Sequence, residues 1–330
     1  MHTLRSRPSH RCSPESPNCS YNKQLLKVFP HPLTCTVMHF MVGSIMAITM
    51  WTFNLHERPN IKLESLKKVS PLAGINVLGN VLTNVSLRAV AVSFTHTVKA
   101  LEPFFSVIMS FFFLGTVPTL PVAASLVPIV TGVALASTSE LTFNWTGFLA
   151  ALGSNITFQS RNVLSKKFML KGTGMDNINL FNILTIMSFL ILAPIAIAVE
   201  GVLVTPSLIE TLRAEGMLVK AIIASVSFHA YQQISYLILQ RVTPVTHSVG
   251  NCVKRVVVIV ASVIAFNLTV SKQNAFGTAL ALFGVFLYSQ AKRAPEKKAK
   301  AAKAAKAAAA DENAREAREW IAAWKAKHQA

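Results

Sequence analysis

Three basic side chains lie inside long apolar segments of the chain, where charged residues are rare. Lys99 lies in one such segment, and Lys254 and Arg255 are neighbours in another. An ionised side chain within a lipid-spanning segment is costly and usually serves a function. No acidic residue lies near Lys254 and Arg255 in the sequence, so this pair indicates a binding site for an anion. Lys99 can alternatively pair with Glu102, which follows it by one helical turn.

Other polar residues in apolar segments extend this candidate site. Arg161 is a further basic residue inside such a segment. Asn80 and Thr83 share one face of a helix because they are one turn apart, and Tyr231 occupies a corresponding stretch later in the chain. Their amide and hydroxyl groups could donate hydrogen bonds to phosphate or carboxylate oxygens. Polar residues also hold membrane helices together, so each of these residues alone leaves both interpretations open.

The rest of the sequence carries no signature of an enzyme, a metal centre or a pump. It lacks the G-x-S-x-G, H-E-x-x-H and Walker motifs, and its four cysteines show neither metal-ligand spacing nor a disulfide framework. We therefore expect no catalytic residue, metal or cofactor, and favour a secondary carrier over a pump, with a channel as an alternative. The net charge of +18 comes largely from the ends and a few loops, so no nucleic-acid partner is expected.

The composition indicates a protein surrounded by lipid. Hydrophobic residues make up 52% of the 330 positions, and only 14% are charged. A bilayer span needs about 20 mostly apolar residues, and only helices and closed barrels satisfy their backbone hydrogen bonds in hydrocarbon. The sequence therefore predicts an all-α integral membrane protein. Nine spans can be counted, near residues 33–55, 69–92, 94–116, 118–138, 144–165, 178–199, 218–240, 244–267 and 273–291.

Basic residues are distributed unevenly between alternate loops. One side collects the loop 56–68, the lysines near 166–171 and the lysine-rich tail, whereas the opposite loops carry far fewer. Positively charged loops stay on the cytoplasm-like side of a membrane. We therefore expect the loop 56–68 and the tail to share one face.

Three short sequence matches indicate an internal repeat. They occur in the same order at nearly one offset: THTV at 95–98 with THSV at 246–249, GVALAS at 132–137 with GVFLYS at 284–289, and NVS at 84–86 with QIS at 233–235. A repeat of about five helices inverts the second half, and such carriers hold substrate between the halves near the bilayer midplane. The repeat predicts related halves at about 21–140 and 141–292, with cations from both meeting at one centre.

Two inverted halves of five helices require ten, so one helix is expected before residue 33. Residues 1–20 are instead rich in Arg, Ser and Pro, which suits part of a plastid transit peptide but not a span. The other interpretation is that the gene sequence is truncated or wrongly joined at this end. Residues 293–330 form a basic Ala/Lys-rich tail, expected to be a solvated helix or, alternatively, a membrane-surface anchor.

Three motifs, VSLRAVAVSFTHTVKALEPFFSV, SELTFNWTGFLAALGSN and VTHSVGNCVKRVVVIVASV, are long and specific. In them, and over residues 21–292, the chain resembles the plastid phosphate translocators of the drug/metabolite transporter superfamily. Asn80 stands where the triose-, glucose- and pentose-phosphate branches usually carry His. The segments QSRNVLSKK and HAYQQISYLILQRVTPVTHSVGNCVKR also resemble the phosphoenolpyruvate branch. Of the family's first helix, only the end, Tyr21–Gln24, is recognisable.

The resemblance implies exchange of inorganic phosphate for phosphoenolpyruvate across the plastid inner envelope, by ten helices in two inverted halves. It places the implied anion site on Asn80, Thr83, Lys99, Arg161, Tyr231, Lys254 and Arg255. The expected partners are the two substrates and membrane lipid. Two alternatives remain: a carrier for triose phosphate, another sugar phosphate or a nucleotide sugar, and a membrane protein that lacks the first helix and does not transport.

Overall fold

The computed structural model describes residues 17–59, 63–141, 143–170, 176–201, 217–242 and 271–292, with short stretches between 246 and 264 and the single residues 315 and 320. Arg255, residues 1–16 of the N-terminal segment, and most of the expected eighth span and of the tail lie outside this part. Expectations for them stay predictions.

Every element that the structure describes is a helix, which confirms the all-α fold class. The labelled helices are α1 (Pro17–Val28), α2 (Pro32–Thr52), α3 (Leu63–Ala89), α4 (Val92–Lys99), α5 (Glu102–Leu114), α6 (Leu120–Thr138), α7 (Trp145–Leu170), α8 (Asn177–Glu200) and α10 (Met217–Arg241). A further helix covers residues 272–292.

Four of the described units are long and apolar enough to cross a bilayer, by length and composition: α2, α4 together with α5, α6 and α8. The helices α3, α7 and α10 are as long, with 27, 26 and 25 residues. They are less apolar because each carries buried polar residues, among them Asn76 on α3, Arg161 on α7 and Gln232 on α10. The count of nine spans stays a prediction.

The third expected span, 94–116, corresponds to the candidate span Val92–Leu114, within which the helix is interrupted. The chain forms α4 and α5 in its place, interrupted at Ala100 and Leu101, and α5 carries a proline in its first turn. A proline near a helix start is tolerated because the first amides have no intrahelical partner. The interruption places Lys99 at the carboxyl end of α4 and Glu102 at the amino end of α5. Each charge therefore faces the helix-dipole end of opposite sign.

A short helix, α1, precedes the first expected span. Its 12 described residues extend about 18 Å. Leu25 and Leu26 of α1, and Phe29 just after it, are buried in one cluster. The cluster also contains Leu87 of α3, Val92 of α4, Ala221 of α10 and Val258. The helix therefore packs into the bundle.

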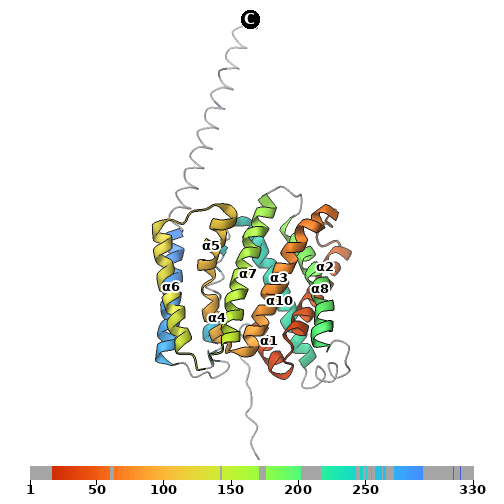
Figure 1. Ribbon diagram of the computed structural model, residues 1–330. Coiled ribbons are helices and arrows are strands. Elements are labelled where there is room, and N and C mark those ends of the chain that lie inside the picture. Colours follow the sequence, from red (N-terminus) through yellow and green to blue (C-terminus); the bar gives the residue numbers. More distant parts are fainter. Residues whose placement is uncertain are drawn as a thin grey trace, which may run out of the picture.

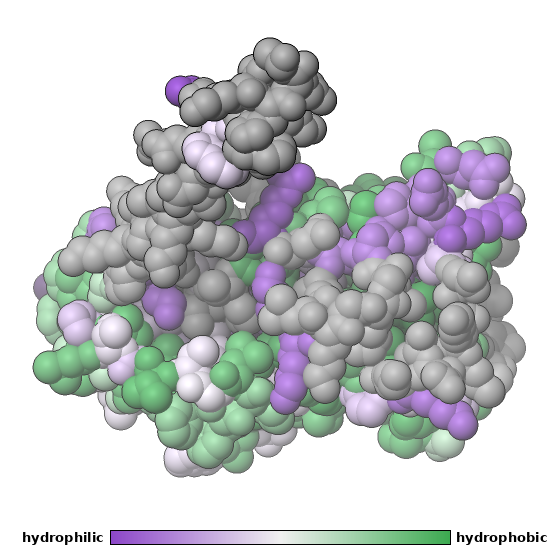
Figure 2. All heavy atoms as spheres, turned by 90° about the horizontal axis from the view of Figure 1, so that it is seen from above, coloured by the Kyte–Doolittle hydropathy of each residue, from purple (hydrophilic) through white to green (hydrophobic). Residues whose placement is uncertain are grey.

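The helices form one bundle with α3 and α7 near its middle (Figure 1). The pair α3 and α7 shares the most extensive packing of the described elements. At one end of the bundle α6 lies beside the helix 272–292, and at the other end lie α2 and α8 (Figure 1). Hydrophobic residues dominate much of the periphery when the bundle is seen from above, and hydrophilic residues gather over parts of that face (Figure 2). Such a periphery suits lipid contact.

The seam between α6 and the helix 272–292 depends on glycine. A Cβ atom at Gly132 would lie 2.3 Å from the backbone nitrogen of Ala281, and one at Gly284 would lie 2.7 Å from that of Ile129. These two contacts are related by the same offset that relates Gly132 to Gly284 in the sequence repeat. This seam supports two related halves, whose boundaries stay a prediction.

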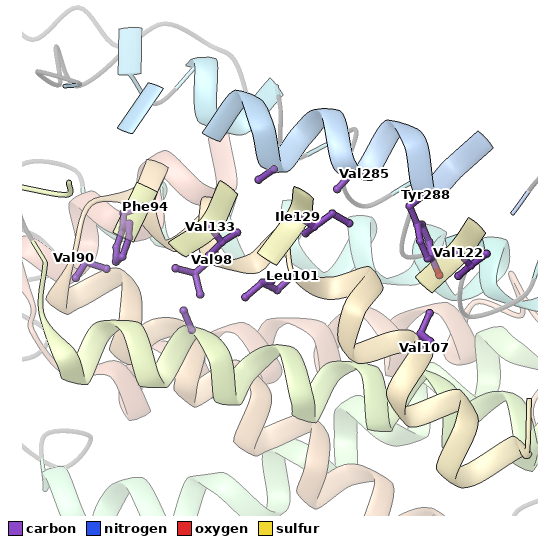
Figure 3. Close-up of a cluster of buried hydrophobic side chains, with 12 residues drawn as sticks. Val90, Phe94, Val98, Leu101, Val107, Val122, Ile129, Val133, Val285 and Tyr288 are labelled. Atoms are coloured by element: carbon purple, nitrogen blue, oxygen red, sulfur yellow. The ribbon is translucent and has the colours of Figure 1, made fainter. Parts of the chain in front are cut away.

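An apolar cluster joins this seam to the interrupted span. Val98 and Leu101 from the interrupted span point toward Ile129 of α6 and Val285 of the helix 272–292 (Figure 3). The phenolic ring of Tyr288 lies in the same cluster and is fully buried. The cluster fixes the outer side of α4, whose last residue is Lys99.

Candidate anion-binding site

A cavity of about 340 Å³ lies between the helices. Its lining includes six of the seven residues expected at the anion site: Asn80, Thr83, Lys99, Arg161, Tyr231 and Lys254. They come from α3, α4, α7, α10 and the segment that contains residue 254. The fold therefore brings together residues that are up to 174 positions apart in the chain. Arg255 lies outside the described residues, so its role in the site stays a prediction.

The α3–α4 wall of this cavity, formed by Asn80, Thr83 and Lys99, is held by internal contacts. The Lys99 ammonium donates a 2.7 Å hydrogen bond to the Thr83 hydroxyl and lies 4.9 Å from the centre of the Phe158 ring. The Thr83 hydroxyl donates to the carbonyl of Gly79. Lys99 is 6% exposed. This wall therefore offers a buried cation whose position is set before any anion arrives.

Asn80 belongs to the same wall through its own helix. Its amide nitrogen donates a 2.8 Å hydrogen bond to the backbone oxygen of Asn76 and a 3.3 Å hydrogen bond to the side-chain oxygen of Asn76. In this arrangement the amide nitrogen of Asn80 bonds within α3, and a substrate oxygen would compete with Asn76 for it.

Arg161 is buried at the edge of the cavity and is oriented by several neighbours. Its guanidinium donates a 2.8 Å hydrogen bond to the side-chain oxygen of Asn76 and a 2.9 Å hydrogen bond to that of Asn162. It also lies 4.9 Å from the centre of the Phe158 ring and 5.3 Å from that of Tyr236. A guanidinium that bonds to two amide oxygens and lies near two rings keeps its planar donor edge in a defined direction.

The Tyr231–Lys254 wall, formed by these two residues, is more open. The Lys254 ammonium lies 3.2 Å from the centre of the Tyr231 ring. Lys254 is exposed, whereas Tyr231 is half-buried. A cation over an aromatic face is attracted by the ring quadrupole and still has hydrogens available for another acceptor. This wall therefore presents a cation to the interior of the cavity.

Glu102 adds a negative charge to the lining of the cavity. The sequence allowed it as the partner of Lys99, and in the structure its carboxylate accepts a 2.7 Å hydrogen bond from Gln159. Glu102 is 2% exposed. The described lining thus holds the cations Lys99, Arg161 and Lys254 against one carboxylate. The cavity keeps an excess of positive charge, which suits an anion.

The helices, the charge of the cavity and the sequence of residues 17–289 agree on one family. These residues match the Triose-phosphate Transporter family. The chain belongs to this family. The expected resemblance to the plastid phosphate translocators is thereby confirmed, and the fold is that of a membrane transporter.

Several named translocators of this family are similar to the chain over most of its length. It is 56% identical to phosphoenolpyruvate/phosphate translocator 1 of Oryza sativa, over 84% of this chain and 69% of that protein. It is also 56% identical to a triose phosphate/phosphate translocator of non-green plastids from Brassica oleracea, over 84% of this chain and 70% of that protein. The identity to the triose phosphate/phosphate translocator of Pisum sativum is 41%, over 84% of this chain and 69% of that protein.

A solved crystal structure has the same fold. It superposes with a TM-score of 0.57 and covers 84% of this chain and 96% of the other, at 16% sequence identity. At this identity the likeness concerns the fold alone. It indicates that the helix arrangement is shared well beyond close relatives.

Sequence reasoning missed several cavity residues that are not ionisable. Phe158 faces both Lys99 and Arg161, but its ring carries no signal that separates it from a core aromatic residue. Asn76 is outside the cavity lining but bonds to both Asn80 and Arg161, and its position one turn before Asn80 on the same helical face could have suggested it. His247, in the repeated motif, shares a 2.6 Å hydrogen bond with Ser235.

Proposed function

We propose that this chain is an antiporter that exchanges inorganic phosphate for phosphoenolpyruvate across the inner envelope membrane of plastids. The observation that carries the proposal is the cavity inside a membrane bundle, lined by Lys99, Arg161 and Lys254. A family member with cations from separate helices around one cavity has the groups needed to replace the hydration water of a phosphorylated anion. The plastid location is supported by relatives from Oryza sativa and Arabidopsis thaliana whose names describe them as chloroplastic.

Both substrates carry a phosphate group, which the two cavity walls can bind in complementary ways. Lys99 offers a charge-assisted hydrogen bond from the buried α3–α4 wall, and Lys254 offers another from the open Tyr231–Lys254 wall. Arg255 is expected to add a paired donor edge beside Lys254. An anion bound by both walls draws them together, because it neutralises cations that otherwise repel each other.

The charge of the cavity supports obligate exchange. Alternating access requires the walls to close over the centre during each crossing. With phosphate or phosphoenolpyruvate bound, most of the excess positive charge is balanced. An empty cavity must bury Lys99, Arg161 and Lys254 with Glu102 as the only acid among its described lining residues. Desolvating the excess positive charge costs several kcal/mol, so the empty carrier should return slowly.

Uptake into liposomes tests this proposal. Purified protein is reconstituted into liposomes that contain either phosphate or an inert buffer anion, and the uptake of labelled phosphate is followed. We expect fast uptake only into phosphate-loaded liposomes. Comparable uptake into both would contradict exchange, and no uptake into either would favour the alternative of a membrane protein that does not transport.

Triose phosphate is the second candidate counter-substrate. It is supported by the relative from Brassica oleracea, whose name is that of a triose phosphate/phosphate translocator and whose identity to the chain equals that of the relative from rice. Competition of unlabelled phosphoenolpyruvate, triose phosphate and 3-phosphoglycerate against labelled phosphate separates the two. Stronger competition by triose phosphate would replace phosphoenolpyruvate in the proposal and leave the exchange mechanism unchanged.

A further inference from the structure

A buried lysine on the short helix α1 lies outside the lining of the cavity. Lys23 is 9% exposed, and its ammonium donates hydrogen bonds to the backbone oxygens of Leu87 and Val90, the second at 2.7 Å. A buried charge in a membrane bundle is costly unless its hydrogen bonds are satisfied. Here the acceptors are one carbonyl of α3 and one of the connection that follows it, so this lysine has a specific target.

The target is the turn between α3 and α4. The helix α3 ends at Ala89, and α4 begins at Val92, so only Val90 and Ala91 connect them. The last carbonyls of a helix have no intrahelical partner and form the negative end of its dipole. The amino end of α4 has no side-chain cap. Lys23 of α1 therefore places a cation at the carboxyl end of α3 and satisfies its carbonyls.

This turn sets how α4 lies against α3. The hydroxyls of Ser86 and Thr95 share a 3.0 Å hydrogen bond across the two helices. Further along, Lys99 of α4 reaches Thr83 of α3 at 2.7 Å. A change in the angle of the turn is thus carried along α4 to the ammonium that faces the cavity.

We propose that Lys23 is a positioning residue for the anion site, which holds the α3–α4 turn so that α4 presents Lys99 to the cavity. The proposal rests on Lys99 as a ligand of the transported anion. Lys23 acts from α1 without touching the anion, through Leu87 and Val90. The helix α1 then contributes to transport through its packing against the α3–α4 turn.

The main test replaces Lys23 with Met, which keeps much of the length and removes the donors. We expect the KM for phosphate homoexchange in liposomes to rise about tenfold, because a small misplacement of a ligand strongly weakens its action. Lys27→Met is the matched control on the same helix, since Lys27 is exposed, and it should leave the KM unchanged. Lys23→Arg, which keeps the charge and donors, should restore most of the affinity.

A double-variant cycle separates positioning from a general loss of folding. If Lys23 acts through Lys99, then Lys23→Met should change the KM far less in a Lys99→Gln background than in the natural protein. Equal factors in both backgrounds, or an unchanged KM for Lys23→Met alone, would overturn the proposal. If Lys23→Met does not fold, Lys23→Gln, which keeps one amide donor, enters the same cycle.

The readout also separates this inference from the proposed function. Phosphate homoexchange does not depend on which phosphorylated metabolite is the counter-substrate, so a failure of phosphoenolpyruvate to compete leaves the Lys23 comparison intact. Phosphate-dependent thermal stabilisation of the detergent-purified protein gives the same comparison without transport. Loss of that stabilisation in Lys27→Met as well as in Lys23→Met would also overturn the proposal.

Discussion

The two walls of the cavity hold their cations in different ways. On the α3–α4 wall, Lys99 is buried, bonded to Thr83 and placed over Phe158. On the Tyr231–Lys254 wall, Lys254 is exposed and held over one aromatic ring. Water screens an exposed charge far more than a buried one. The first wall should therefore determine how strongly an anion binds, while the second adapts to the anion and follows it during closure.

The largest effect is expected for Lys99→Gln, which removes the buried charge. A hydrogen bond to a charged group contributes up to about 3 kcal/mol, so its loss should slow phosphate exchange roughly a hundredfold. Initial rates of homoexchange in liposomes measure this, with the exposed Lys272→Ala as a control outside the cavity lining. The same variant should raise the phosphate-independent leak relative to exchange, since fewer cations then repel each other in the empty carrier. A smaller loss than that of Lys254→Ala would reverse the comparison.

The second prediction concerns Lys254→Ala on the open wall. We expect a loss of about 2 kcal/mol, because the exposed cation is partly screened before the anion binds. The difference from the natural protein should shrink at high ionic strength, whereas the effect of Lys99→Gln should change little. Exchange rates at low and high salt test this difference between the two walls, and equal salt dependence for both variants would contradict it.

Asn80→His should change selectivity more than overall binding. Phosphoenolpyruvate carries its carboxylate on the carbon that bears the phosphate, so a compact site must donate to two neighbouring anionic groups. An imidazole in place of the amide should shift preference toward three-carbon compounds phosphorylated at the end, by about 1 kcal/mol for one hydrogen bond. Competition between phosphoenolpyruvate, triose phosphate and 3-phosphoglycerate measures the shift. An unchanged ranking would remove Asn80 from the residues that discriminate between substrates.

The smallest effect is expected at Tyr231, whose ring holds Lys254. Tyr231→Leu should weaken phosphate exchange by about 0.5–1 kcal/mol, the range of an exposed cation–π contact. Tyr231→Phe keeps the aromatic face and is the matched control, with nearly natural exchange. If Tyr231→Phe loses as much as Tyr231→Leu, the hydroxyl rather than the ring is what the wall uses.

Much of the membrane fold could be predicted from single segments. Long apolar runs specify helices in lipid whatever their neighbours do, because the backbone must satisfy its own hydrogen bonds there. The interruption at Ala100 and Leu101 escaped this reasoning, since hydropathy is an average that does not register a local break. The rarity of charges in apolar segments likewise singled out Lys99, Arg161 and Lys254 from the amino-acid sequence, because such residues are costly.

The amino-acid sequence is enough to specify a helical membrane protein of one transporter family, with a small set of cations available for an anion. How those cations are held depends on tertiary packing: Lys99 is buried against Thr83, Lys254 is open over Tyr231, and Lys23 is turned away to the end of α3. All three are lysines in or beside apolar sequence, and the nearby Glu102 separates Lys99 from Lys254 only as a possible partner. The distinction arises because burial and hydrogen-bond partners come from helices distant in sequence, and these set the strength of each charge.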